Sequence, residues 1–282
     1  MARLRIGGVP EHFNLPWRLA IESGALSDIG IDAEWIDVPG GTGAIMAHLA
    51  DGTLDLATPL TEGLLAAMAS GHEAKLVRTW VDSPLLWGIF VAGNSPHRTV
   101  DDLRGLRFAI SRWGSGSELM ARVLADSRGW ALDNAADFVV INNLDGALEA
   151  LPAGNAEIFL WNKSMTQPHV DNGTLRLAGE FPTPWPSFCT AAAKDVEPAL
   201  ITTATAIAET KARTLAASPG TPELVAERYD IDLSGAQDWF STLRWNTDGS
   251  PIDHDMVQQV LDKLHAVGRL DSRIEASELL AT

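Results

Sequence analysis

The chain has 282 residues, of which 46% are hydrophobic and 21% charged, so it can bury a sizeable core in one large domain or two smaller ones. Its 37 acidic residues outnumber its 21 lysines and arginines, and the net charge of −16 argues against nucleic acid or an anionic membrane surface as the main partner. The single cysteine, Cys189, excludes an internal disulfide and a cysteine zinc cluster. We interpret it as a packed small hydrophobic residue.

Residues 1–9 have neither the long apolar stretch nor the cleavage site of a secretory signal, and no run of about 18 apolar residues exists that would cross a membrane. As given, the chain is expected in the cytoplasm. It would be periplasmic or extracellular if a signal had been removed. No membrane insertion is expected.

The first part of the chain alternates short strands and helices. Strands are predicted at 4–9, 33–38, 54–57, 75–80 and 86–91, with helices at 16–26, around 45–49 and before 70–71. This alternation at short spacing predicts a largely parallel sheet covered by helices. The segment 94–97, with Pro96, is expected to be a lobe boundary.

A second α/β run follows. Strands are predicted at 106–110, 138–141 and 157–161, with one helix after the loop 111–117 and another at 145–151. Near 185–187 the chain is expected to leave this lobe. The remainder is mostly helical, at 200–217 and 253–267. The last helix carries an apolar stripe that we interpret as core packing: Met256, Val257, Val260, Leu261, Leu264 and Val267.

Candidate ligand residues follow from the position of the loops. In open parallel sheets, ligands bind beyond the carboxyl ends of strands. Four loops have this position, at 11–14, 40–43, 58–62 and 111–117. Trp87, Trp113, Trp161 and Trp185 lie near strand ends, where aromatic rings often line clefts. The predicted ligand-binding residues are Glu11, His12, Asn14, Gly41, Thr42, Gly43, Thr61, Glu62, Arg112, Trp113, Ser115, Gly116, Ser117 and Trp161.

The loop 111–117 is the most informative of the four. Gly114 and Gly116 permit close backbone approach, and Ser115 or Ser117 can cap the following helix. The amides of the first turn suit a carboxylate, phosphate or sulfonate, and Arg112 can add a charge-assisted bond. The alternative is a loop that only caps its helix. The sequence of the loop 111–117 matches neither a Walker A loop nor a dinucleotide-binding fingerprint.

The sequence offers no motif for metal binding or nucleophilic catalysis. His12 can be a base, a ligand donor or a structural histidine, and Glu62 can bind ligand or only complement a helix dipole. The seven histidines include no pair at metal-site spacing, and no Gly-x-Ser-x-Gly elbow occurs. No catalytic residue, metal or cofactor is therefore predicted.

Four stretches, at 4–16, 52–57, 100–110 and 160–168, carry a family resemblance. Residues 52–57 have the pattern Gly-x-x-Asp-hydrophobic-Ala, and 102–105 read Asp-Leu-Arg-Gly. In order and spacing the chain resembles the type 2 periplasmic binding proteins of the sulfonate, nitrate and thiamine-pyrimidine group. The stretch 160–168 resembles a poorly characterised branch, in which an acidic residue is expected where this chain has Asn162.

The resemblance implies an α/β, two-lobed type 2 periplasmic-binding-protein-like fold with a ligand cleft between the lobes. Residues 1–92 and 186–282 would form a discontinuous first lobe, and 93–185 the second. The implied function is capture of a small polar organic molecule, anionic or zwitterionic, by hinge closure. The protein would serve an importer or act as an intracellular receptor. Its partners would be that small molecule and the permease of an ABC transporter.

An enzyme on the same fold is the competing reading, since fold does not settle function. The resemblance admits a menaquinone-pathway dehydratase-like lyase or an enzyme of pyrimidine or sulfur metabolism. A pyrimidine synthase of this fold needs a cysteine-rich segment, and a desulfinase needs a cysteine nucleophile. The chain offers only Cys189. A binding protein is favoured, and the question of turnover stays open.

Overall fold

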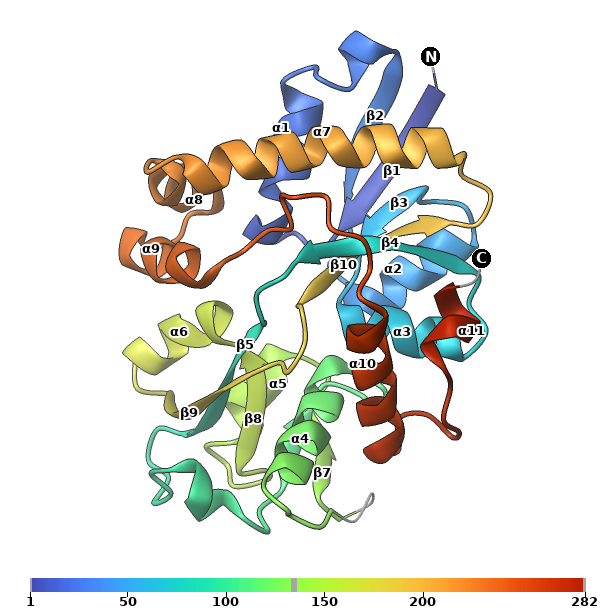
Figure 1. Ribbon diagram of the computed structural model, residues 1–282. Helices are drawn as coiled ribbons and strands as arrows, with labels where there is room; N and C mark the ends of the chain where they lie inside the picture. The colour runs from blue at the N-terminus through green and yellow to red at the C-terminus, as the bar shows by residue number, and fades with distance from the viewer. Residues whose placement is uncertain (1, 133–135, 281–282) are drawn as a thin grey trace. The chain divides into compact units, whose positions relative to one another are not determined.

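The computed structural model describes residues 2–132 and 136–280 (Figure 1). The chain forms two compact units. The first comprises the chain up to Ser83, Trp185–Leu264 and the chain from Ser272 onward, and the second comprises Pro84–Pro184 and His265–Asp271. Each unit contains one five-stranded sheet. No helix among the described residues is long and apolar enough to cross a membrane.

The first sheet has the order β2-β1-β3-β10-β4. Strand β1 runs parallel to β2 and β3, and β10 runs antiparallel to β3 and β4. The strands are β1 (Ala2–Gly8), β2 (Ile31–Asp37), β3 (Leu56–Thr58), β4 (Ala74–Val81) and β10 (Phe188–Ala193). The carboxyl ends of β1, β2 and β3 therefore meet at one edge, where the loops after them begin the candidate site.

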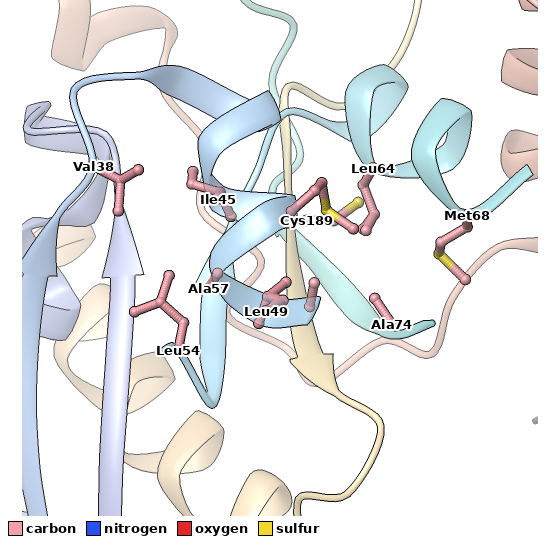
Figure 2. Close-up of a cluster of buried hydrophobic side chains, with 11 residues drawn as sticks. Val38, Ile45, Leu49, Leu54, Ala57, Leu64, Met68, Ala74 and Cys189 are labelled. Carbon is pink, nitrogen blue, oxygen red and sulfur yellow. The ribbon is translucent and has the colours of Figure 1, made fainter. Parts of the chain in front are cut away.

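Helices α2 (Gly41–Ala50) and α3 (Thr61–Ala69) cover this sheet with a buried hydrophobic cluster, shown in Figure 2. Cys189 of β10 lies inside the cluster, fully buried beside Leu64. Burial raises the pKa of its thiol to about 12, so it is a packed, unreactive group at neutral pH.

Further helices complete the first unit. They are α1 (Leu15–Glu22), α7 (Pro198–Ala217), α8 (Thr221–Tyr229), α9 (Leu233–Thr242), α10 (His254–Ala266) and α11 (Ala276–Leu280), with single turns η1 (His12–Asn14) and η2 (Ser27–Ile29). The last two residues of α10 fall in the second unit. Helix α1 packs on α7. Both carry buried contacts with β4: Trp17 meets the ring of Trp80, and Glu209 pairs with Arg78. Most of the α10 stripe is buried, as expected for core packing.

The second sheet has the order β7-β6-β8-β5-β9. Its strands are β5 (Leu86–Ala92), β6 (Phe108–Ile110), β7 (Phe138–Val140), β8 (Ile158–Asn162) and β9 (Leu175–Pro182), and its helices are η3 (Val100–Leu103), α4 (Gly116–Ser127), α5 (Leu144–Ala150) and α6 (Lys163–Asp171). A buried cluster joins β5, β6, β8 and α5 around Phe90 and Phe159.

The units divide between Ser83 and Pro84 and between Pro184 and Trp185. Residues 86–91 are expected in the first lobe from the sequence, but β5 forms antiparallel ladders with β8 and β9 and so belongs to the second sheet. A strand that follows another after a short gap normally pairs with it. Here the gap 82–85 carries the chain to a different sheet, which local pattern does not reveal.

Candidate functional site

The loop after β1 is fixed by buried hydrogen bonds at its end. Asn14 is fully buried, donates from Nδ2 to the carbonyl of Val9 at 2.9 Å, and accepts at Oδ1 from the hydroxyl of Thr58 at 2.7 Å. Its side chain thus joins the carboxyl ends of β1 and β3. Asn14, predicted as a ligand contact, has its amide engaged within the protein.

Gly8 lies beneath this hydrogen bond. A Cβ at Gly8 would meet Thr58 Oγ1 at 2.4 Å and Asn14 Nδ2 at 2.8 Å. We therefore expect Gly8→Ala to lower the free energy of unfolding by about 1–3 kcal/mol through overpacking. Thermal unfolding measures it against Gly235→Ala, where nothing lies within 4 Å of the added Cβ. Because the control replaces a helical glycine, it should raise stability by roughly 0.5–1 kcal/mol. A neutral Gly8→Ala would contradict the packing described.

Aromatic rings surround the same loop. The carbonyl of Phe13 accepts from the indole nitrogens of Trp80, at 3.2 Å, and Trp245, at 2.9 Å. The His12 ring meets Trp239 edge-on, with centroids 4.2 Å apart, and stacks on Phe13. Burial lowers the pKa of His12 to about 4, so the imidazole is neutral at pH 7, and its Nε2 is buried without a partner among the described residues.

The loop after β2 is held to the loop after β3. The hydroxyl of Thr42 accepts from the amide of Leu60 at 3.0 Å, and Gly41 opens α2 with φ of 68°. Gly43 is exposed. A Cβ at Gly63 would lie 2.6 Å from the Thr42 methyl, so α2 and α3 approach closely here. This predicted loop therefore joins the others at the carboxyl edge.

Thr61 and Glu62 begin α3 and are both buried. The amide of Thr61 donates to the carbonyl of Ser187 at 3.1 Å, and its hydroxyl lies 3.3 Å from the sulfur of Cys189. Glu62 is only 1% exposed, and its Oε2 accepts from the indole nitrogen of Trp185 at 2.8 Å. Its Oε1 is buried with no hydrogen-bond partner among the described residues.

Burial also perturbs the acidity of two carboxyl groups in this unit. It raises the pKa of Glu62 to about 7, against the opposing effects of its own amide and of Trp185. It raises the pKa of Glu11 to about 7 as well. Both groups therefore change charge near neutral pH, which is unusual for glutamates and typical of functional sites.

In the second unit, the loop 111–117 is built from internal hydrogen bonds. Ser115 is the N-cap of α4 and accepts from the amide of Glu118 at 3.3 Å, while Ser117 accepts from the amide of Ser111 at 3.0 Å. The amide of Gly114 donates to the carboxylate of Glu118, which Arg122 also contacts, at 2.8 Å. The predicted serine hydroxyls are thus engaged in holding the loop. The first-turn amides of Gly116 and Ser117 have no acceptor within the helix.

Two tryptophans of the second sheet lie at the same edge. Trp87 is 6% exposed, and a Cβ on Gly116 would lie 3.3 Å from its ring. Trp161 stacks on Phe159 with centroids 5.2 Å apart. Trp87 pairs with Asn162 and Trp161 with Gly88, so the two rings lie on opposite faces of the sheet. Both indole nitrogens are buried without partners among the described residues.

Arg112 and Trp113 lie on the outside of this loop. Both are exposed, and Trp113, at 51%, rests edge-on against Phe138. Arg112 forms no ion pair with any described residue, so its charge is available to a ligand. Within residues 2–132 and 136–280, no group of three His, Cys, Asp or Glu side chains is arranged to hold a metal ion.

The comparisons with known proteins agree with this architecture. A family model described as Ca3427-like PBP matches residues 87–181. A comparison with curated protein sequences gives no significant match.

Solved structures match over the whole chain. The CA3427 gene product of Candida albicans, which defines a family with the generic periplasmic binding protein fold, has a TM-score of 0.88 at 25% identity, covering 98% of this chain and 93% of that one. The alkanesulfonate-binding protein SsuA of Xanthomonas axonopodis pv. citri, bound to MOPS, gives 0.77 at 21%, covering 99% and 98%. The periplasmic aliphatic sulphonate binding protein SsuA of Escherichia coli gives 0.75 at 17%, covering 99% and 91%. The chain therefore has the α/β, two-lobed fold of the type 2 periplasmic binding proteins.

Proposed function

We propose that this protein is a solute-binding protein for a small organic oxyanion of the sulfonate class, captured by hinge closure. One observation supports this most directly. Each unit leaves buried polar atoms without partners at the carboxyl edge of its sheet: Glu62 Oε1 and His12 Nε2 in the first, Trp87 Nε1 and Trp161 Nε1 in the second. An unsatisfied buried polar group costs about 1–3 kcal/mol, so such groups are expected where a ligand supplies the partner.

The second unit has the chemistry that an oxyanion needs. The first-turn amides of Gly116 and Ser117 and the indole N–H of Trp87 are all donors, and a helix N-terminus favours negative charge. Glu118 is the acid in that turn, and Arg122 neutralises it. Arg112 adds a free positive charge. The SsuA relative of Xanthomonas axonopodis pv. citri was solved with MOPS, itself a sulfonate, which favours this ligand class.

Titration with ethanesulfonate and MOPS tests the proposal. We expect both to bind, and Arg112→Ala to weaken binding by about tenfold or more, since a hydrogen bond to a charged group contributes roughly 1.5–3 kcal/mol. Arg104→Ala, which removes an exposed arginine outside the loop, is the matched control and should leave the dissociation constant unchanged. Calorimetry that finds no sulfonate binding, or equal affinity for both variants, would contradict the proposal.

We further propose that the two units act as the two lobes and that the chain crossings near 83–84 and 184–185 act as hinges. On this proposal an importer permease is a macromolecular partner. Ligand at a hundredfold excess over its dissociation constant should stabilise the protein by about 2.7 kcal/mol.

An enzyme is the second candidate, and the acidity of two carboxyl groups favours it. Glu11 and Glu62 have pKa values of about 7, which suits general acid–base work near neutral pH. Recovery of the bound sulfonate by mass spectrometry separates the candidates. Unchanged ligand supports a binding protein, and protein-dependent turnover would favour a lyase with Glu11, His12 and Glu62 as the groups to substitute first.

A further inference from the structure

Glu62 is buried more deeply than a helix-capping carboxylate requires. A glutamate in the first turn of a helix complements the helix dipole from the surface, as exposed Glu223 does on α8. Glu62 also lies in the first turn of its helix, α3, but is 1% exposed. Its burial raises the pKa to about 7, which is a cost that dipole complementarity does not explain.

The carboxyl group is also held in one orientation. Trp185, itself buried, donates from its indole nitrogen to Oε2 at 2.8 Å. The preceding residue is fixed on two sides, by the carbonyl of Ser187 and by the sulfur of Cys189. Oε1 is left buried and unpaired within the described part of the chain. An ionised carboxylate only accepts hydrogen bonds, so this oxygen requires a donor.

No donor to this oxygen is present among the described residues. Three arginines of this unit have acids of their own: Arg5 pairs with Asp55, Arg18 with Asp37, and Arg78 with Glu209. No ion pair to Glu62 is present in residues 2–132 and 136–280. A positive group arriving with the ligand would both satisfy Oε1 and compensate the buried negative charge.

We infer that Glu62 binds a protonated amine of the bound solute. Trp185 is the residue that positions the Glu62 carboxylate. This inference rests on the proposed function, because it assigns the second polar group of the same ligand. The solute is then a zwitterion, with an oxyanion and an ammonium group. Selectivity for the ammonium group comes from a single buried oxygen.

Three probes that differ in one group test the inference: 2-aminoethanesulfonate, 2-hydroxyethanesulfonate and ethanesulfonate. We expect the native protein to bind the amine at least about tenfold more tightly than ethanesulfonate, with the alcohol between them. In Glu62→Gln the ratio of amine to ethanesulfonate affinity should fall close to one, while the affinity for ethanesulfonate is retained. Trp185→Phe, which removes only the orienting N–H, should reduce the same ratio partly.

Glu223→Gln is the matched control and should keep the native ratio. Melting temperatures without ligand establish that each variant is folded. If all three sulfonates bind with equal affinity, or if Glu62→Gln keeps the preference, the inference fails while the proposed function stands. If none of them binds to the native protein, both fail together.

Discussion

Replacing Glu209 by alanine is expected to lower the free energy of unfolding by about 3–5 kcal/mol, because it leaves a buried cation unpaired. Glu209 of α7 pairs with Arg78 of β4, and each residue is only 8% exposed. Arg78 would keep its hydrogen bond to Asn246, at 2.5 Å, and the electrostatic effect of Asp82 and Asp248, but lose its buried ion-pair partner. Urea unfolding, read as a midpoint shift at constant slope, measures the effect.

Two controls separate an unpaired charge from a lost contact. Lys194→Ala removes an exposed pair, with Glu73, and should cost less than about 1 kcal/mol. Arg78→Met combined with Glu209→Leu removes both charges and should recover much of the stability lost by Glu209→Ala. A double variant as unstable as the single one would show that packing, and not the charge, dominates.

The second prediction with a large effect is a gain in stability. We expect Glu62→Gln to raise the free energy of unfolding at pH 8 by about 3 kcal/mol and to leave it nearly unchanged near pH 4. The pKa of Glu62 is about 7 in the folded protein, against an ordinary value of 4.5. As the pH rises from 4.5 to 7, the unfolded chain loses this proton while the folded protein retains it, so stability falls. Glutamine has no carboxyl proton to lose, so Glu62→Gln removes this fall in stability.

The measurement is the difference between variant and native protein in urea unfolding at several pH values. Taking the difference removes the contributions of Glu11, whose pKa is also raised, and of His12, whose pKa is lowered. Glu223→Gln should give a small difference at every pH, because that carboxylate is exposed. A difference for Glu62→Gln that does not grow between pH 5 and 8 would contradict the burial described. If Glu62→Gln is both more stable and less selective for the amine, then the native glutamate lowers the stability of the fold while it provides ligand recognition.

Much of the fold was predictable because most strands and helices carry their own signal. Strands such as β1 and β4 and helices such as α7 and α10 appear where hydrophobic pattern and turn residues predict them. β10 was missed. Its sequence, Phe-Cys-Thr-Ala-Ala-Ala, is buried except at Ala193 and lies between two strands, so it shows no alternation and few strand-favouring residues. β9 was missed as well, since it is largely half-buried with mixed composition.

The candidate site was less predictable, because its decisive contacts cross long stretches of sequence. The loops after β1, β2, β3 and β6 follow from the rule that ligands bind beyond strand ends. That Glu62 is oriented by Trp185, or that His12 is enclosed by Trp239, depends on residues more than a hundred positions apart. For the serines of the 111–117 loop, residue type predicted a ligand contact that the structure does not favour. Their side chains suit a ligand by type, yet hydrogen bonds within the loop already occupy them.

The order of strands in the first sheet also bears on how the protein is made. β10 lies between β3 and β4, yet its residues follow the whole run that builds the second sheet. During synthesis the strands up to β4 emerge first, but β3 and β4 lack their common neighbour until residues 188–193 leave the ribosome. The second sheet, by contrast, comes from one continuous stretch, β5 to β9. Chain growth should therefore complete the second sheet first and leave the amino-terminal strands with unpaired edges, where chaperone binding is most useful.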